Sequence, residues 1–186
     1  MPRIDDIEDT PNPNAKKFML KEPLTWGIAR SYENAGQAVG DPLAAALFQI
    51  EHVRDVFYID SWITVAQDGS ADWRELSRKL ADPIRAAPAA GGRSAQLAFG
   101  AESGLTEVAP EDQERLESFN LLLDEQVRPY LQGDGGDLHV LGLKGNLLTL
   151  HYQGACGSCP SSISGTLAGI EGMLRTIEPD LEVMAI

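Results

Sequence analysis

The hydrophobic pattern is most regular in the second half of the chain, where apolar side chains recur every three or four residues in two separate stretches. Such spacing places them on one face of a helix, so each stretch predicts an amphipathic helix with one buried stripe. The first stripe comprises Leu116, Phe119, Leu123, Val127 and Tyr130, and the second comprises Ile163, Leu167, Ile170, Leu174 and Ile177. Pro129 is expected to kink or end the first helix, because proline lacks the amide hydrogen that a helix interior needs.

Between these helices the pattern changes to that of strands. The segments "LHVLGLK" and "LLTLHYQ" flank Gly145–Asn146, which predicts a β-hairpin with a two-residue turn. An unbroken register would place a mostly apolar row of pairs on one face, namely Leu143 with Leu148, Leu141 with Leu150 and His139 with Tyr152. The final segment "LEVMAI" indicates one more strand, so this half has the order α-β-β-α-β, which implies a small sheet with helices on one face.

The first half of the chain combines strand and helix signals. β-Branched and aromatic residues predict strands in "KKFML", "VRDVFYI" and "WITVAQ", with Asp60–Ser61 as the turn between the last two. The segment "DPLAAALFQI" predicts a helix that is capped by Asp41 and has Pro42 at its first position. The segment "DWRELSRKLADPIRA" predicts an amphipathic helix whose apolar face comprises Trp73, Leu76 and Leu80.

A stretch rich in alanine, glycine, proline and serine separates the two halves. It runs from Ala86 to Pro110 with little charge and no clear period, so it predicts a flexible linker. We therefore expect an N-terminal domain at 1–87, a linker at 88–110 and a C-terminal domain at 111–186. The predicted fold class is α+β, with two small domains that each layer helices on a sheet.

The charge of the chain limits the classes of partner. The formal net charge is −13, and residues 111–186 hold 12 acidic side chains against 4 basic ones. A phosphate backbone attracts lysine and arginine, so we expect no nucleic-acid partner, and the acidity favours solubility or docking onto basic partners. No apolar run is long enough to span a bilayer, so we expect no membrane partner. The acidic opening "MPRIDDIEDT" lacks the pattern of a signal or transit peptide, which predicts a cytoplasmic protein.

The only two cysteines, Cys156 and Cys159, lie in "GACGSCPSS" directly before the second predicted helix. Pro160 suits the first position of a helix, so we expect Cys159 at or near the N-cap and Cys156 in the preceding loop. Unpaired amides and the helix dipole favour anions at such a place, which lowers the pKa of a thiol. Gly154 and Gly157 would let the backbone approach the sulfurs closely. The loop is therefore interpreted as a site that holds thiolates.

Four interpretations of this loop remain open on the residues alone. A dithiol oxidoreductase uses a Cys-x-x-Cys at a helix start, but no β-α-β unit precedes the motif here and no aromatic residue adjoins it. A zinc ion is usually held by four ligands. His151 is a candidate for a third ligand beside the two cysteines, whereas His139 is expected in the core. An iron–sulfur cluster usually takes four thiolates, which two chains related by a two-fold axis could supply. The fourth interpretation is a pair of ordinary buried cysteines.

The segment "VRPYLQGDGGDLHVLGLKGNLLTLHYQGACGSCPSS" resembles the C-terminal module of NifU and of Nfu-type iron–sulfur scaffold proteins. The features that carry the resemblance are Arg128-Pro129, the turn Asp134-Gly135-Gly136-Asp137, the hairpin, and the loop from Gly154 to Ser162. In the first half, "DTPNPNAKKFML" and "DPLAAALFQIEHVRDVFYIDSWITV" resemble the Nfu N-terminal domain. The resemblance covers nearly the whole chain apart from the linker.

The resemblance implies a function in iron–sulfur cluster assembly. Members of this family are carriers, not enzymes, and they bind a [4Fe-4S] cluster between two chains through the Cys-x-x-Cys motif. They accept clusters from upstream scaffold proteins and deliver them to apo iron–sulfur client enzymes. The resemblance assigns Cys156 and Cys159 as the cluster and iron ligands, implies a homodimer when the cluster is bound, and gives the N-terminal domain a role in partner recognition or regulation. Asp134 and Asp137 are expected to shape their turn rather than to touch the cluster.

Three positions depart from the family pattern. Leu167 stands where the family often has lysine, so a positive charge near the cluster end is absent. His52 and Ile59 stand where the family often has glycine, so the local turn geometry is expected to differ there.

Overall fold

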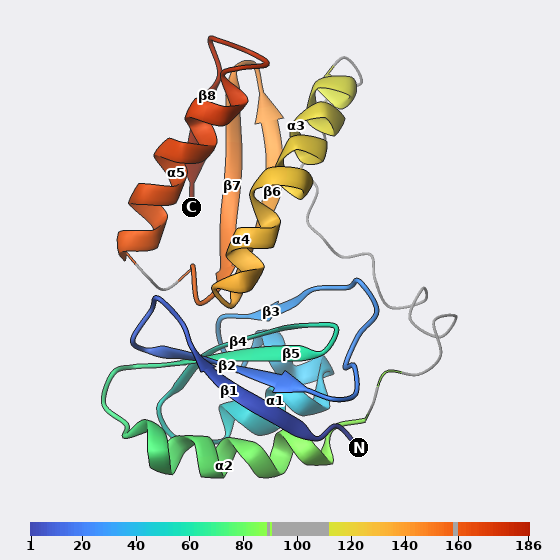
Figure 1. Ribbon diagram of the computed structural model, residues 1–186, viewed down its shortest axis with the longest axis vertical. Coiled ribbons are helices and arrows are strands. Elements are labelled where there is room, and N and C mark those ends of the chain that lie inside the picture. The colour runs from blue at the N-terminus through green and yellow to red at the C-terminus, as the bar shows by residue number, and fades with distance from the viewer. Residues whose placement is uncertain (89, 91–111, 158–159) are drawn as a thin grey trace. The chain divides into compact units, whose positions relative to one another are not determined.

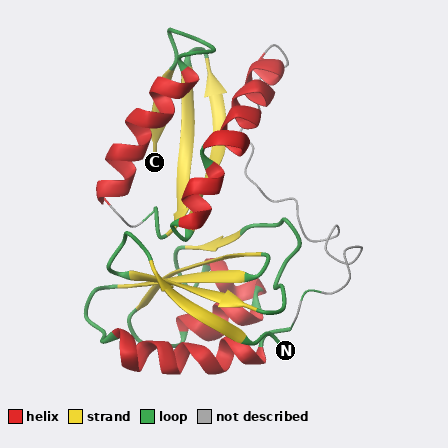
Figure 2. Ribbon diagram, in the orientation of Figure 1, coloured by secondary structure: helices red, strands yellow, loops and turns green. Residues whose placement is uncertain are grey.

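The computed structural model describes residues 1–88, 90, 112–157 and 160–186. The chain divides into two compact units, Met1–Ala101 and Glu102–Ile186. Each unit combines helices with a sheet, which confirms the predicted α+β class (Figures 1 and 2). Most of the predicted linker at 88–110 lies outside the described residues.

The N-terminal unit is built on a five-stranded antiparallel sheet in the order β1-β2-β5-β4-β3, with α1 and α2 on one face (Figure 1). The apolar core lies between that face and the two helices. The elements are β1 (Ile4–Asp9), β2 (Ala15–Leu20), β3 (Arg30–Tyr32), the short 3-10 helix η1 (Gln37–Gly40), α1 (Pro42–Phe48), β4 (Val53–Ile59), β5 (Trp62–Gln67) and α2 (Trp73–Ala86).

Aspartate caps determine where the two helices of this unit begin. The side chain of Asp41 accepts a hydrogen bond from the Ala44 amide at 2.9 Å and Pro42 follows it, as the sequence predicts. Asp72 caps α2 through two amides of its first turn. The apolar face of α2 then packs into the core with the buried side chains of Leu76, Leu80 and Ile84.

Two strands of this sheet are not evident in the sequence. The edge strand β1 reads "IDDIED" and is almost entirely exposed, so it carries no alternating apolar signal. Ion pairs with β2 hold it, since Lys16 Nζ lies 2.6 Å from Asp9 and Lys17 Nζ lies 3.8 Å from Glu8. Strand β3 has only three residues and is defined by its pairing with β4. Both strands therefore depend on their pairing with a neighbouring strand rather than on an apolar pattern of their own.

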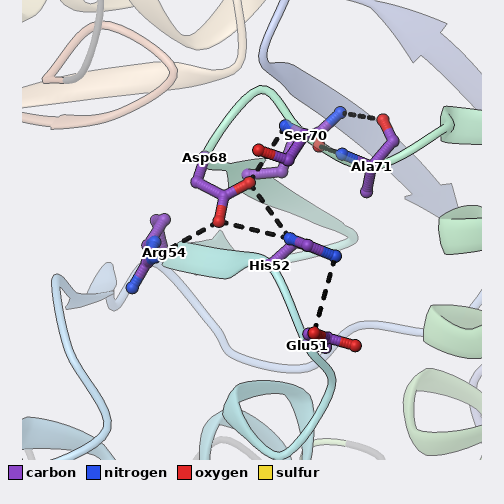
Figure 3. A network of polar contacts seen from close by, with 7 residues as sticks. Glu51, His52, Arg54, Asp68, Ser70 and Ala71 are labelled. Atoms are coloured by element: carbon purple, nitrogen blue, oxygen red, sulfur yellow. Dashed lines mark hydrogen bonds and ion pairs between the residues drawn. The ribbon is translucent and has the colours of Figure 1, made fainter.

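A polar network surrounds the turn before β4 (Figure 3). The Asp68 carboxylate lies 3.2 Å from His52 Nδ1 and 3.2 Å from Arg54 Nη2, and it accepts the Ser70 amide at 3.0 Å. His52 has a φ of +76°, the left-handed conformation that favours glycine. His52, which stands where the family often has glycine, thus keeps the backbone conformation of a glycine. At the next turn the positive φ of +49° belongs to Asp60, not to Ile59.

The C-terminal unit has a three-stranded sheet in the order β6-β7-β8, with β6 antiparallel and β8 parallel to the central strand. Side chains from its three helices and from the sheet form one apolar core. The elements are α3 (Gln113–Gln126), α4 (Arg128–Gly133), β6 (Gly136–Lys144), β7 (Leu147–Gly154), α5 (Pro160–Leu174) and β8 (Glu182–Ala185). This order agrees with the predicted α-β-β-α-β arrangement, except that the first helix is in two pieces.

The break between α3 and α4 falls at Val127, two residues before Pro129, where the sequence predicts a kink or an end. The break rotates the following turn, so Leu131 is buried and Tyr130 is 76% exposed. The prediction that Tyr130 continues the buried stripe is therefore wrong. The stripe of α5 likewise ends early, because the helix stops at Leu174 and Ile177 is half exposed.

The hairpin of β6 and β7 contains a β-bulge that the sequence does not reveal. The predicted pair of Leu143 with Leu148 is present, but the register shifts between Val140 and Gly142. Beyond the bulge, Leu150 faces Val140, Tyr152 faces Leu138 and His151 faces His139. The predicted pairs of Leu141 with Leu150 and His139 with Tyr152 are therefore wrong. The extra residue moves His139 off the core face, because side chains alternate along a strand.

Candidate functional site

Cys156 lies in the short loop between the end of β7 and the start of α5. Its side chain is buried, with 3% exposure, and it belongs to the apolar core of the C-terminal unit. The start of α5 at Pro160 agrees with the predicted helix position. Cys159, the other cysteine assigned from the sequence, lies outside the described residues, so the pairing of the two cysteines stays a prediction.

Glycines let the loop approach the sheet closely. Gly154 has a φ of +64°, which turns the chain back over β6, and the Ala155 amide donates to the Gly135 carbonyl at 3.1 Å. A Cβ on Gly136 would lie 2.6 Å from the Cys156 sulfur and 2.9 Å from the Cys156 nitrogen. The sulfur therefore rests directly on the bare backbone of β6.

Gly157, which follows Cys156, lets the loop approach β7 closely. A Cβ on Gly157 would lie 2.7 Å from the Tyr152 carbonyl oxygen, so a side chain would push the loop away from β7. The sequence identified Gly154 and Gly157 as residues that admit close approach. It did not identify Gly136 as the residue on which the Cys156 sulfur packs. The adjacent glycines of "GDGGD" could have indicated a close approach of the backbone there.

The Arg-Pro and Asp-Gly-Gly-Asp features meet in one buried contact. Asp137 is 3% exposed and lies 3.1 Å from Arg128 Nη1, and it accepts Gln132 Nε2 at 3.0 Å. This contact holds α4 against the start of β6. Asp134 is exposed and caps the end of α4, where its amide donates to the Tyr130 carbonyl at 3.0 Å. Both placements support the expectation that these aspartates shape the turn.

Tyr152 brings a polar group to the same region. Its side chain is 4% exposed, and its hydroxyl has no hydrogen-bond partner within the described part of the chain. Burial, together with the charge of nearby Cys156, raises the pKa of Tyr152 to about 12. Buried polar atoms without a partner are uncommon in folded proteins, so this hydroxyl next to the cysteine loop calls for an explanation.

The histidines lie elsewhere. His151 alternates with Tyr152 along β7 and so faces away from the core, with Nδ1 3.0 Å from the Ile186 carbonyl oxygen. His139 is half buried, and burial, with the charges of Arg128 and His151, lowers its pKa. Among the described residues, no group of three or more His, Cys, Asp and Glu side chains could hold a metal ion. His151 is thus not placed as a third ligand beside Cys156.

Fold and site together define a two-unit α+β protein with a glycine-cradled cysteine directly before a helix. The family model for the scaffold protein Nfu/NifU N-terminal domain matches residues 4–91, and the model for the NifU-like domain matches residues 120–184. The mitochondrial NFU1 iron-sulfur cluster scaffold homolog of Drosophila ananassae is 34% identical over 176 residues, which cover 94% of this chain and 61% of that protein. The protein of the same name from Drosophila persimilis is 34% identical, and the match covers 94% of this chain and 62% of that protein. The chain therefore belongs to the Nfu family of NifU-like scaffold proteins, and it spans about three fifths of the length of these relatives.

Solved structures give a weaker likeness. A crystal structure of a Staphylococcus aureus protein has a TM-score of 0.40 at 23% identity and covers 44% of this chain and 98% of its own. A solution structure of a NifU-like protein from Saccharomyces cerevisiae has a TM-score of 0.39 at 24% identity, with 53% and 82% covered. Both scores are below 0.5, so the family assignment does not draw on them.

The relatives correct one expectation drawn from the sequence. They are named as mitochondrial proteins, which points to mitochondria, so the prediction of a cytoplasmic protein is wrong. That prediction relied on the first residues of a chain that matches only 61–62% of its relatives' length. Within the described residues, no helix combines the length and the apolar character that crossing a membrane requires.

Proposed function

We propose that this protein is a carrier, not an enzyme, that binds an iron–sulfur cluster through Cys156 and Cys159 and delivers it to apo-proteins. The observation that carries the proposal is the packing of the Cys156 sulfur on Gly136 shortly before the start of α5, since a helix start favours a thiolate. The buried, unpaired hydroxyl of Tyr152 fits a sulfur ligand that bears negative charge. The names of the NFU1 relatives, which are iron–sulfur cluster scaffolds, support the same cargo.

The cargo is a [4Fe-4S] cluster held between two chains. Such a cluster usually takes four thiolates, and each chain has two cysteines. Two copies related by a two-fold axis supply the full set, so the loaded form is a homodimer. A cluster that is shared in this way is released when the two chains separate, which suits delivery better than permanent electron transfer.

Delivery proceeds by exchange of thiolates. A cysteine of the client attacks one iron, and an iron–sulfur bond to Cys156 or Cys159 breaks as the new bond forms. The proton of the client thiol passes to the departing cysteine, and no electron changes hands. The clients are apo iron–sulfur enzymes, and the clusters come from upstream scaffold proteins.

The two-domain assignment gives each part a task. The C-terminal domain at 111–186 holds the cluster site. The N-terminal domain at 1–87 has no cysteine, so it serves partner recognition or regulation, and the linker at 88–110 joins the two. These assignments extend the family match, which covers both domains.

Anaerobic reconstitution with iron and sulfide, followed by native mass spectrometry, tests the proposal. We expect a dimer that carries the mass of one Fe₄S₄ unit, and we expect Cys156→Ser and Cys159→Ser each to abolish it. The matched control is Asp134→Asn, an exposed change near the site that should leave loading intact. A metal-free monomer that reduces a disulfide substrate would instead identify a thiol oxidoreductase.

A further inference from the structure

Tyr152 has a buried hydroxyl for which the fold of the C-terminal unit gives no reason. It contributes its ring to the core, a task that phenylalanine would perform without a hydroxyl. Its oxygen is buried and finds no hydrogen-bond partner among the described residues. Such a group destabilises the folded state, because the hydroxyl gives up its bonds to water on folding and gains none in return. A partner that is present only in another state of the protein would account for it.

The register of the hairpin brings Tyr152 close to the place of the Cys156 sulfur, in line with the electrostatic influence of Cys156 on Tyr152. Tyr152 faces Leu138, and one step further along the same face Gly154 faces Gly136. The Cys156 sulfur occupies the space that a side chain on Gly136 would fill. Gly136 and Tyr152 are therefore diagonal neighbours on one face, a separation that an aromatic side chain can span.

We propose that the Tyr152 hydroxyl donates a hydrogen bond to the Cys156 sulfur when that sulfur is a thiolate bound to iron, and so sets how firmly the cluster is held. The inference rests on the proposed function. A protonated thiol is a weak acceptor, whereas a thiolate is a charged and much stronger one. The hydroxyl is thus unsatisfied in the empty protein and satisfied in the loaded one. This difference in contacts shifts the equilibrium toward loading. Tyr152 is a positioning residue, since it acts through Cys156.

The substitution Tyr152→Phe separates this role from a structural one, because the two states respond with opposite sign. In the empty protein it removes an unsatisfied buried hydroxyl, so the melting temperature of the C-terminal unit should rise by about 4 °C or more. In the loaded protein it removes a charge-assisted hydrogen bond, so removal of the cluster by an iron chelator should be about tenfold faster. Tyr130→Phe is the control, since Tyr130 is 76% exposed and should change neither value.

The possible failures can be told apart. If the wild-type protein takes up no cluster, the proposed function is wrong and this inference falls with it. If the wild type loads but Tyr152→Phe holds its cluster as long, only the role of Tyr152 is overturned. A lower melting temperature of the empty variant would also overturn it, because the hydroxyl would then have a partner in the empty fold.

A pocket in the N-terminal unit carries an independent inference. It has a volume of about 190 Å³ and lies where η1 meets α1. Arg30, Asp41 and Tyr58 contribute its polar wall, and apolar side chains such as Leu24 and Leu43 line the rest. With about 30 Å³ for each water molecule, the volume corresponds to roughly six waters or one small organic ligand.

The two charges on the polar wall are not equally available. Asp41 accepts hydrogen bonds from the Ala44 amide at 2.9 Å, from the Tyr32 hydroxyl at 2.9 Å and from the Tyr58 hydroxyl, so most of its acceptor sites are used. Arg30 bonds to Tyr32, and within the described residues it forms no ion pair closer than 4.0 Å. Burial acts to lower the pKa of Arg30, but the bond to Tyr32 and the neighbouring charges raise it overall, so the guanidinium stays charged.

We infer that this pocket binds a carboxylate with a short aliphatic body. The planar guanidinium of Arg30 pairs with a carboxylate through two parallel hydrogen bonds, and the apolar wall accommodates the aliphatic part. The nearby Asp41 charge disfavours a doubly charged phosphate. The same chemistry is offered by a small free acid and by the C-terminal carboxylate of a peptide that ends in an aliphatic residue.

Heteronuclear NMR of the full chain tests this site with butyrate, with a short peptide ending in leucine, and with the same peptide as its amide. We expect shifts at the Leu43 and Ala44 amides with at least one acid, and none with the peptide amide. A response to butyrate alone identifies a free acid, and a stronger response to the peptide acid identifies a chain terminus. Absence of shifts with both acids would overturn the inference.

Two variants and a control locate the binding. Arg30→Gln should weaken it at least tenfold. Gly40→Leu should block it, because a Cβ on Gly40 meets nothing within 4 Å and the new side chain has open space at the pocket. Arg54→Gln removes an exposed arginine outside the pocket and should leave affinity unchanged. Equal loss with Arg54→Gln would show a nonspecific charge effect and would also overturn the inference.

Discussion

Gly136 is the residue whose replacement should report most directly on the seat of Cys156. The Cβ of an alanine would lie 2.6 Å from the Cys156 sulfur, 2.7 Å from the Gln153 oxygen and 2.9 Å from the Cys156 nitrogen. Ordinary contacts of a Cβ begin near 3.4 Å, so every one of these distances must increase. Two of the three atoms are main-chain atoms that cannot rotate away. The loop and β6 must therefore move apart.

The size of the effect follows from these contacts. Added volume in a well-packed core typically costs about 1–3 kcal/mol, and three simultaneous clashes place Gly136→Ala near the top of that range, at about 3 kcal/mol. The matched control is Gly133→Ala, because a Cβ there meets nothing within 4 Å and Gly133 has no positive φ. That change should stabilise the unit by about 0.4–1 kcal/mol, since alanine restricts the unfolded chain.

Urea unfolding followed by circular dichroism measures the difference, with an internal control in the chain itself. All three tryptophans, Trp26, Trp62 and Trp73, belong to the N-terminal unit, so their fluorescence should show an unchanged transition. In a Cys159→Ser background, Cys156 should also react faster with a thiol reagent, because it no longer lies flat on β6. A cost below about 1 kcal/mol with unchanged thiol reactivity would refute the cradle described here.

Three further changes have defined outcomes. His52→Gly should stabilise the N-terminal unit by about 1 kcal/mol in urea unfolding, because the φ of +76° strains a residue with a side chain and the lost contact with Asp68 is near the surface. A net loss of stability would show that the contact with Asp68 dominates. Asp137→Asn should destabilise the C-terminal unit by about 2 kcal/mol through its buried contact with Arg128, and the expectation fails if Asp134→Asn costs as much. Because the pKa of His139 is lower in the folded protein than in the unfolded chain, the unfolded chain binds a proton at a higher pH, and stability should fall as the pH drops through 6.5. His139→Gln should weaken this pH dependence. An unchanged pH profile would contradict the expectation.

Much of the fold can be predicted because its signals are local. The capping aspartate with proline at α1, the apolar spacing of α2 and α5, and the glycine-asparagine turn of the hairpin each act over a few residues. The cysteine loop falls in this class as well, since Pro160 marks the start of α5. The family resemblance drew on the same local motifs.

The rest depends on contacts between distant residues. The bulge between Val140 and Gly142 is one extra residue that no local preference announces, yet it reverses the face of His139. The acidic strand β1 is defined by its pairing with β2, whose lysines lie opposite its acidic side chains. Gly136 appears in sequence as a turn residue, and only the folded hairpin shows that a sulfur twenty residues later needs the space above it.

The burial of Cys156 has a kinetic consequence for the proposed carrier. Because only 3% of this residue is exposed, a thiolate from another protein cannot reach an iron atom bound to its sulfur while Cys156 stays packed on Gly136. Opening must first lift the loop from Gly136 and break the bond between the Ala155 amide and the Gly135 carbonyl. Because this step involves one molecule, the transfer rate should level off as client concentration rises, at a plateau common to all clients. The carrier, and not the client, would then set the maximum rate of delivery.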